Sequence, residues 1–184
     1  LRRQRQMCIR DRHTTMHYKL TNDTITHNGS VLHRIQAIKD LPQHNVKKGD
    51  LGGYVETQHN LSGNAWVYND AKVYQGARLA NNATAANEAE IYGKARLYDN
   101  ARAIDHTHVC ESAILDKNAL AANKARVGGQ VRMTDNARAV EEARLDGEVR
   151  LSDNACACGN AWLSGKIRLK GAVEVRDILE VCKG

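Results

Sequence analysis

The stretch GNAWVYNDAKVYQGARL, residues 63–79, decides the fold of this chain. It places an aliphatic residue at every sixth position, at Val67, Val73 and Leu79, with an alanine two positions before each. This spacing differs from the period of an α-helix, about 3.6 residues, and from the simple alternation of one continuous strand. Polar residues fill the intervals, so the pattern predicts short strands with two inward residues each, joined by polar corners.

The same frame runs through most of the chain. Every sixth residue from Val55 to Val181 is apolar, with no slip. The positions two before form a second lattice, which from Ala65 to Leu179 holds only Ala, Val, Ile and Leu apart from Thr107. The corners are rich in Asn, Asp and Gly, residues that tolerate left-handed backbone angles. A core of small side chains also suits a composition with one proline and no phenylalanine.

A longer period of 18 residues groups the inward positions into three faces, of which the first is mostly alanine, as at Ala85, Ala103 and Ala121. The second face carries Val, Ile and Leu, and the third carries Leu and Met. Three hexads therefore form one coil of a triangular prism, with coils stacked at the strand spacing of about 4.8 Å. The sequence predicts an all-β fold, a parallel β-helix of about seven coils.

An aliphatic residue at position i with a small residue at i+4 resembles the hexapeptide repeat of left-handed β-helices. This superfamily contains trimeric acyltransferases and γ-class carbonic anhydrases, and the resemblance covers about residues 50–182. It implies a left-handed helix and a homotrimer. Residues 16–62, with GDLGGYVE leading into NLSGNAWVY, further resemble uncharacterised phage and prophage hexapeptide-repeat proteins, some of which carry an acetyltransferase label.

The first residues do not follow the repeat. Residues 2–12 match the translation of a common transposase sequencing adapter, so we expect 1–15 to be a non-native or disordered leader and Met16 to be the start. Residues 1–12 hold five Arg and one Asp, and without them the net charge falls from +6 to +2. This weaker charge argues against nucleic acid as a partner.

Residues 16–48 are expected to form a cap over the first coil of the helix, which spans 49–184. Asn28-Gly29 between two apolar stretches predicts a hairpin with strands near 17–26 and 31–39. The cap would cover the unpaired strand edges that the end of a β-helix exposes.

Acyl transfer with acetyl-CoA is the enzymatic alternative that the resemblance supplies. It requires a histidine base, and beyond residue 62 the coils contain only His106 and His108. His108 points outward, with Glu90 one coil before it in position to orient the imidazole. The uninterrupted frame leaves no room for a substrate loop, which argues against catalysis. His106, His108 and Cys110 do not converge on one ion, so no metal site is expected, and Cys156 and Cys158 are interpreted as reduced surface thiols.

The outward residues before the Leu and Met face form an arginine ladder, defined as Arg78, Arg96, Arg132, Arg150 and Arg168. Like charges at coil spacing repel unless something neutralises them. One interpretation is neutralisation by nearby carboxylates such as Asp116, Asp135 and Asp153. The other is an anionic partner, either a phosphate-bearing ligand or an acidic host protein, including a sponge that traps nucleotide signals.

The outer side of the alanine face carries an apolar strip, represented by Trp66, Tyr68, Ile104, Leu120 and Val140. A long apolar strip on a protein surface favours contact with another copy, and cover by the hairpin is the alternative. The sequence as a whole predicts a non-catalytic binding and assembly module without a cofactor. In the absence of an apolar run long enough for a membrane span, and of a secretory signal after Met16, we expect it in the cytoplasm.

Overall fold

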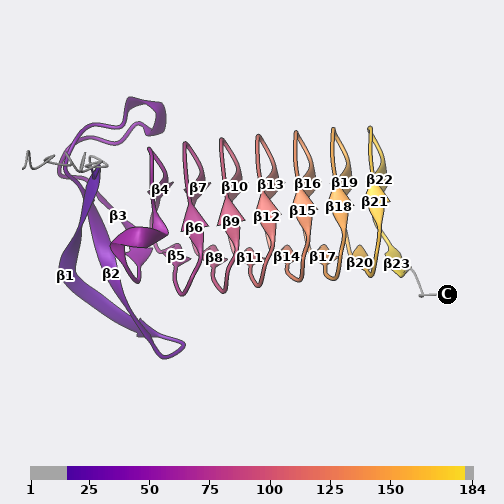
Figure 1. Cartoon of the computed structure of the whole chain (residues 1–184), viewed down its shortest axis with the longest axis horizontal. Coiled ribbons are helices and arrows are strands. Elements are labelled where there is room, and N and C mark those ends of the chain that lie inside the picture. Colours follow the sequence, from indigo (N-terminus) through magenta and orange to yellow (C-terminus); the bar gives the residue numbers. More distant parts are fainter. Residues whose placement is uncertain (1–15, 181–184) are drawn as a thin grey trace, which may run out of the picture.

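The computed structural model describes residues 16–180, and it confirms a parallel β-solenoid of 18-residue coils (Figure 1). The coils stack in one row, and an antiparallel hairpin closes the N-terminal end (Figure 1). The expected leader, residues 1–15, lies outside the described residues. The left-handed sense implied by the resemblance stays a prediction.

Three sheets form the sides of the solenoid, with ten, seven and six strands. The ten-stranded sheet contains, in order, β1 (Tyr18–His27), β2 (Ser30–Ala37), β3 (Leu51–Val55), β5 (Lys72–Val73), β8 (Glu90–Ile91), β11 (His108–Val109), β14 (Arg126–Val127), β17 (Arg144–Leu145), β20 (Trp162–Ser164) and β23 (Ile178–Glu180). The seven-stranded sheet contains β4 (Trp66–Val67), β7 (Thr84–Ala85), β10 (Arg102–Ala103), β13 (Leu120–Ala121), β16 (Arg138–Ala139), β19 (Cys156–Ala157) and β22 (Glu174–Val175). The six-stranded sheet contains β6 (Arg78–Leu79), β9 (Arg96–Leu97), β12 (Ile114–Leu115), β15 (Arg132–Met133), β18 (Arg150–Leu151) and β21 (Arg168–Leu169).

The core consists of the two predicted lattices. Inward residues pair with their equivalents one coil away, as Leu115 does with Leu97 and Met133. Both lattices are fully buried through the central coils, so apolar residues of one kind stack along each face. The inward residues of the last coil are less buried, and Val173 is 43% exposed. Burial therefore decreases toward the C-terminal end of the solenoid.

From Gly63 to Gly171 the corners adopt the left-handed conformation that the sequence predicts, with one residue of positive φ at each, as at Asn81 and Asp99. Four of these corner residues are Gln, Glu or Lys, which occur less often in this conformation. Some corner side chains compensate by bonding to the next coil. Glu111 accepts a hydrogen bond from Gly129 N at 2.8 Å, and Gln75 accepts one from Gly93 N at 2.8 Å. Side-chain bonds thus join the corners of successive coils.

The cap begins with the predicted hairpin, although its strands are β1 (Tyr18–His27) and β2 (Ser30–Ala37) instead of 17–26 and 31–39. A loop with the 3-10 turn η1 (Pro42–His44) follows. β3 pairs antiparallel with β2 and parallel with β5, so it joins the cap to the solenoid in one sheet. A second 3-10 turn, η2 (Gln58–Asn60), presents the Asn60 amide to Ala77 O at 2.9 Å.

Two glycines allow the cap to approach the first coil. A Cβ on Gly52 would lie 2.5 Å from Val67 O, and one on Gly53 would lie 2.5 Å from Ala71 O. Both distances are shorter than real carbon contacts, so β3 can lie against the coil only without side chains at these positions. This requirement explains the two adjacent glycines of the GDLGGYVE motif.

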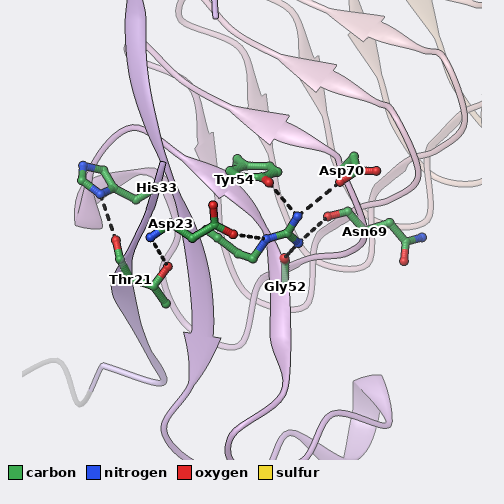
Figure 2. A network of polar contacts seen from close by, with 8 residues as sticks. Thr21, Asp23, His33, Gly52, Tyr54, Asn69 and Asp70 are labelled. Atoms are coloured by element: carbon green, nitrogen blue, oxygen red, sulfur yellow. Dashed lines mark hydrogen bonds and ion pairs between the residues drawn. The ribbon is translucent and has the colours of Figure 1, made fainter. Parts of the chain in front are cut away.

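Arg34 on β2 fastens the cap to the solenoid (Figure 2). Its guanidinium donates to Tyr54 Oη at 2.6 Å and to Gly52 O at 2.8 Å, and it bonds Asp23 on β1 at 3.0 Å (Figure 2). It also reaches Asp70, at the corner between β4 and β5, at 3.4 Å. Charge-assisted bonds of this kind are stronger than neutral ones, so one side chain ties β1, β2 and β3 to the first coil.

Candidate functional site

The arginine ladder lies on the six-stranded sheet, as predicted. Arg78, Arg96, Arg132, Arg150 and Arg168 stand on β6, β9, β15, β18 and β21, and all five are exposed. Arg78 is in register with Arg96, and Arg132, Arg150 and Arg168 follow one another in register, with Ile114 between the two groups. Adjacent members are therefore about one strand spacing, ~4.8 Å, apart along the sheet.

Carboxylates neutralise the ladder only in part. Arg132 donates to Asp116 Oδ2 at 2.8 Å, but Asp135 pairs with Lys117 instead. Asp153 accepts a hydrogen bond from the backbone N–H of Gly171. Within residues 16–180, the other four arginines of the ladder have no ion pair. The predicted neutralisation is correct for Arg132 alone.

A hollow of about 410 Å³ opens at the C-terminal half of the ladder. Arg132, Arg150 and Arg168 line it together with Asp116. Lys117, Lys170 and the hydroxyl-bearing Thr134 and Ser152 also contribute to its wall. The hollow therefore combines several cations with hydroxyl groups, which is the chemistry that binds phosphate-like anions.

Asp116 adds an unusual group to this hollow. The residue is only 8% exposed, and its Oδ1 atom has no hydrogen-bond partner among the described residues. A buried acceptor without a donor destabilises the fold by roughly 1–3 kcal/mol. Because this atom is shielded from solvent, an N–H or O–H donor from outside the chain reaches it only when the carboxylate turns toward the hollow.

His106 and His108 come together in another hollow, of about 450 Å³, whose wall also includes Arg126 and Arg144. His106 Nδ1 lies 3.1 Å from Glu88 Oε2. His108 is half-buried and its ring meets the Tyr92 ring edge-on. The structure thus brings the two candidate histidines together with cations.

The predicted partnership of Glu90 with His108 is replaced by a contact with the cap. Glu90 Oε2 accepts hydrogen bonds from His27 Nε2 and from Tyr74 Oη, each at 3.0 Å. Burial alone would raise the pKa of Glu90, but these two donors outweigh it and hold the pKa below its ordinary value. Burial also raises the pKa of Tyr74 to about 12, so the phenol keeps its proton. Glu90 therefore holds the hairpin tip on the solenoid.

The apolar strip is shorter than the sequence suggests. Trp66 is only 1% exposed because the cap covers it, and its indole lies 6.4 Å from the His17 ring. Trp66 is therefore a cap contact and cannot be an interface residue. Tyr68 is half-buried and donates its hydroxyl to His44 O at 2.9 Å. The remaining members Ile104, Leu120 and Val140 are half-buried along the seven-stranded sheet.

The prediction that Cys156 and Cys158 are surface thiols is wrong, since they are 4% and 2% exposed. Cys156 lies in register between Arg138 and Glu174, two longer side chains. Arg176 forms an ion pair with Glu174 at the same end of the sheet. A short side chain between long neighbours loses contact with solvent even on the outer side of a strand.

Among residues 16–180, no group of three or more His, Cys, Asp or Glu side chains is arranged to hold a metal ion. The described chain also contains no helix with the length and apolar character of a membrane span. The sequence matches no protein-family model and no curated protein.

Proposed function

We propose that this protein is a non-catalytic binding and assembly module that recognises a small phosphate-bearing anion on its arginine ladder. The observation that carries the proposal is the hollow at Arg150 and Arg168, where cations without an ion pair lie beside a buried acceptor. Phosphate oxygens match the guanidinium groups, and an O–H or N–H of the same ligand matches Asp116 Oδ1.

The test is titration calorimetry with inorganic tripolyphosphate at low and high salt. We expect binding that weakens with salt, because exposed charges are screened. The double variant Arg150→Glu with Arg168→Glu should weaken it roughly tenfold or more. The matched control, Arg126→Glu with Arg144→Glu, makes the same charge change on the ten-stranded sheet and should bind as the wild type does.

The same titration with polyglutamate and acetyl-CoA separates the alternatives. Tighter binding of polyglutamate than of tripolyphosphate would favour an acidic protein partner. Binding of acetyl-CoA that His108→Ala abolishes, together with transfer of the acetyl group to an amine, would favour the acyltransferase and contradict a non-catalytic role. Equal binding of tripolyphosphate by both double variants would remove the ladder as the site.

Self-association is the assembly part of the proposal. Ile104, Leu120 and Val140 support it, because they present half-buried apolar side chains on one sheet. The variant Leu120→Arg with Val140→Arg should keep the circular dichroism of the wild type but sediment as a monomer. Ile114→Arg on the six-stranded sheet is the control and should keep the wild-type oligomer, which the resemblance implies is a trimer. A monomeric wild type would refute association.

A further inference from the structure

A hollow of about 600 Å³ lies beside the cap on the seven-stranded sheet. Its cap side is formed by His44 of η1 and by Tyr68, which follows β4. Its floor carries a row of amides and the guanidinium of Arg102 on β10. The arginine ladder lies on another sheet and contributes no residue to this hollow, whereas Ile104 of the apolar strip also lines it.

The aromatic wall of this hollow is held in place by the backbone. The His44 ring donates from Nε2 to Asn64 O at 2.7 Å, and Tyr68 donates its hydroxyl to His44 O at 2.9 Å. The two rings meet edge-on with their centroids 6.3 Å apart. Because His44 Nε2 and the Tyr68 hydroxyl are both engaged, the wall presents rings of fixed orientation to a ligand.

The amides of Asn82, Asn100 and Asn118 are the part of a longer row that lines this hollow, and the row continues along the same corner to Asn136 and Asn154. Asn82 Nδ2 donates to Asn100 Oδ1 at 3.4 Å, and Asn100 Nδ2 donates to Asn118 Oδ1 at 3.4 Å. Each amide carries two N–H donors and an oxygen with two lone pairs, so the row keeps free donors and acceptors that face solvent. Their spacing of about 4.8 Å suits a ligand with repeated hydroxyl groups, since a hydroxyl both donates and accepts.

Arg102 supplies the charge in this hollow. It lies in register between Thr84 and Leu120, neither of which is acidic, and it is exposed. In the part of the chain that the structure describes, Arg102 forms no ion pair. A planar guanidinium in a concave site is suited to a carboxylate, with which it forms two parallel hydrogen bonds.

We propose that this hollow binds an acidic oligosaccharide. The aromatic wall of Tyr68 and His44 packs against the apolar face of one sugar ring. The amide row of Asn82, Asn100 and Asn118 bonds the hydroxyl groups of successive rings. Arg102 bonds the carboxylate, so neutral sugars of the same length bind more weakly.

The experiment is titration calorimetry of the whole chain with trigalacturonic acid, with neutral maltotriose as the comparison ligand. The variant Arg102→Gln should weaken trigalacturonic acid binding roughly tenfold to hundredfold, the loss expected for a charge-assisted bond. Arg138→Gln removes the exposed arginine two coils away on the same sheet and should bind as the wild type does. Asn100→Leu interrupts the amide row and should also weaken binding.

Three results would overturn this proposal: no binding of trigalacturonic acid at millimolar concentration, equal binding of maltotriose, or equal loss in Arg102→Gln and Arg138→Gln. The variant Arg150→Glu with Arg168→Glu separates this site from the ladder. It should bind trigalacturonic acid as the wild type does, whether or not it binds tripolyphosphate. Loss of sugar binding in that variant would place the sugar on the ladder and refute the assignment.

Discussion

Replacing Leu115 by alanine tests the close packing of the solenoid core. Leu115 is fully buried between Leu97 and Met133, in register on the six-stranded sheet. The change removes roughly three methylene equivalents, which at about 0.8 kcal/mol each gives a transfer cost near 2.4 kcal/mol. Backbone bonds hold the neighbouring coils on both sides, so the space left behind cannot close. A cavity cost brings the expected loss to about 3–4 kcal/mol, within the range measured for buried leucines.

Thermal unfolding followed by far-ultraviolet circular dichroism measures this loss. For a domain of this size, each kcal/mol corresponds to about 2–4 °C, so Tm should fall by roughly 6–16 °C. The matched control is Leu169→Ala, the same change on the same sheet at the less covered last coil, where Leu169 is only partly buried. It should lower Tm by only a few degrees, on the order of 1 kcal/mol. Equal shifts in the two variants would refute a core that is fully packed only in the central coils.

Further predictions concern the cap. Glu90→Gln should lower the free energy of unfolding by about 1–2 kcal/mol at pH 7. The difference in stability between variant and wild type should disappear as the pH falls below the lowered pKa of Glu90, because protonation removes the same charge from the wild type. Burial lowers the pKa of His17 below 6.5, so the unfolded chain takes up a proton at a higher pH than the folded chain does. The free energy of unfolding should therefore fall as the pH drops below 6.5. Denaturant titrations should show a weaker pH dependence of this free energy in His17→Gln. Gly52→Ala should detach the cap and expose Trp66 to fluorescence quenchers. Gly128→Ala should leave quenching unchanged, because its added carbon meets only side-chain atoms, the nearest of them Cys110 Sγ at 3.4 Å.

The repeat could be predicted because its rules are local. Each inward residue, such as Val109 or Leu151, lies six residues from the next one in its lattice, and each corner between them needs only a residue that tolerates positive φ. The same logic places His108 and the arginine ladder on the outer surface. These assignments required no knowledge of what packs against the coils.

The rest depended on contacts between distant segments. Trp66 shares the outward position of exposed residues in later coils, and only the docked cap buries it. Glu90 could have oriented His108, but His27 reaches it from the hairpin tip, a contact between residues 63 positions apart. Asp135 could have neutralised an arginine, but Lys117 of the preceding coil is closer to it. The sequence period does not predict these side-chain pairings, because each depends on which of several nearby side chains binds a shared partner.

The corner bonds that join residues 18 positions apart make the solenoid tolerant of some length changes and intolerant of others. After deletion or duplication of 18 residues, every later residue would still pair in register with an equivalent residue of the neighbouring coil. The solenoid would become shorter or longer by about 4.8 Å. Deleting six residues would keep the hexad frame but turn all later faces by one third of a rotation. Arg150 would then leave the column of Arg132 for that of another sheet. The number of coils in this fold therefore sets the distance between surface sites. Insertions and deletions in related proteins should occur as whole coils of 18 residues.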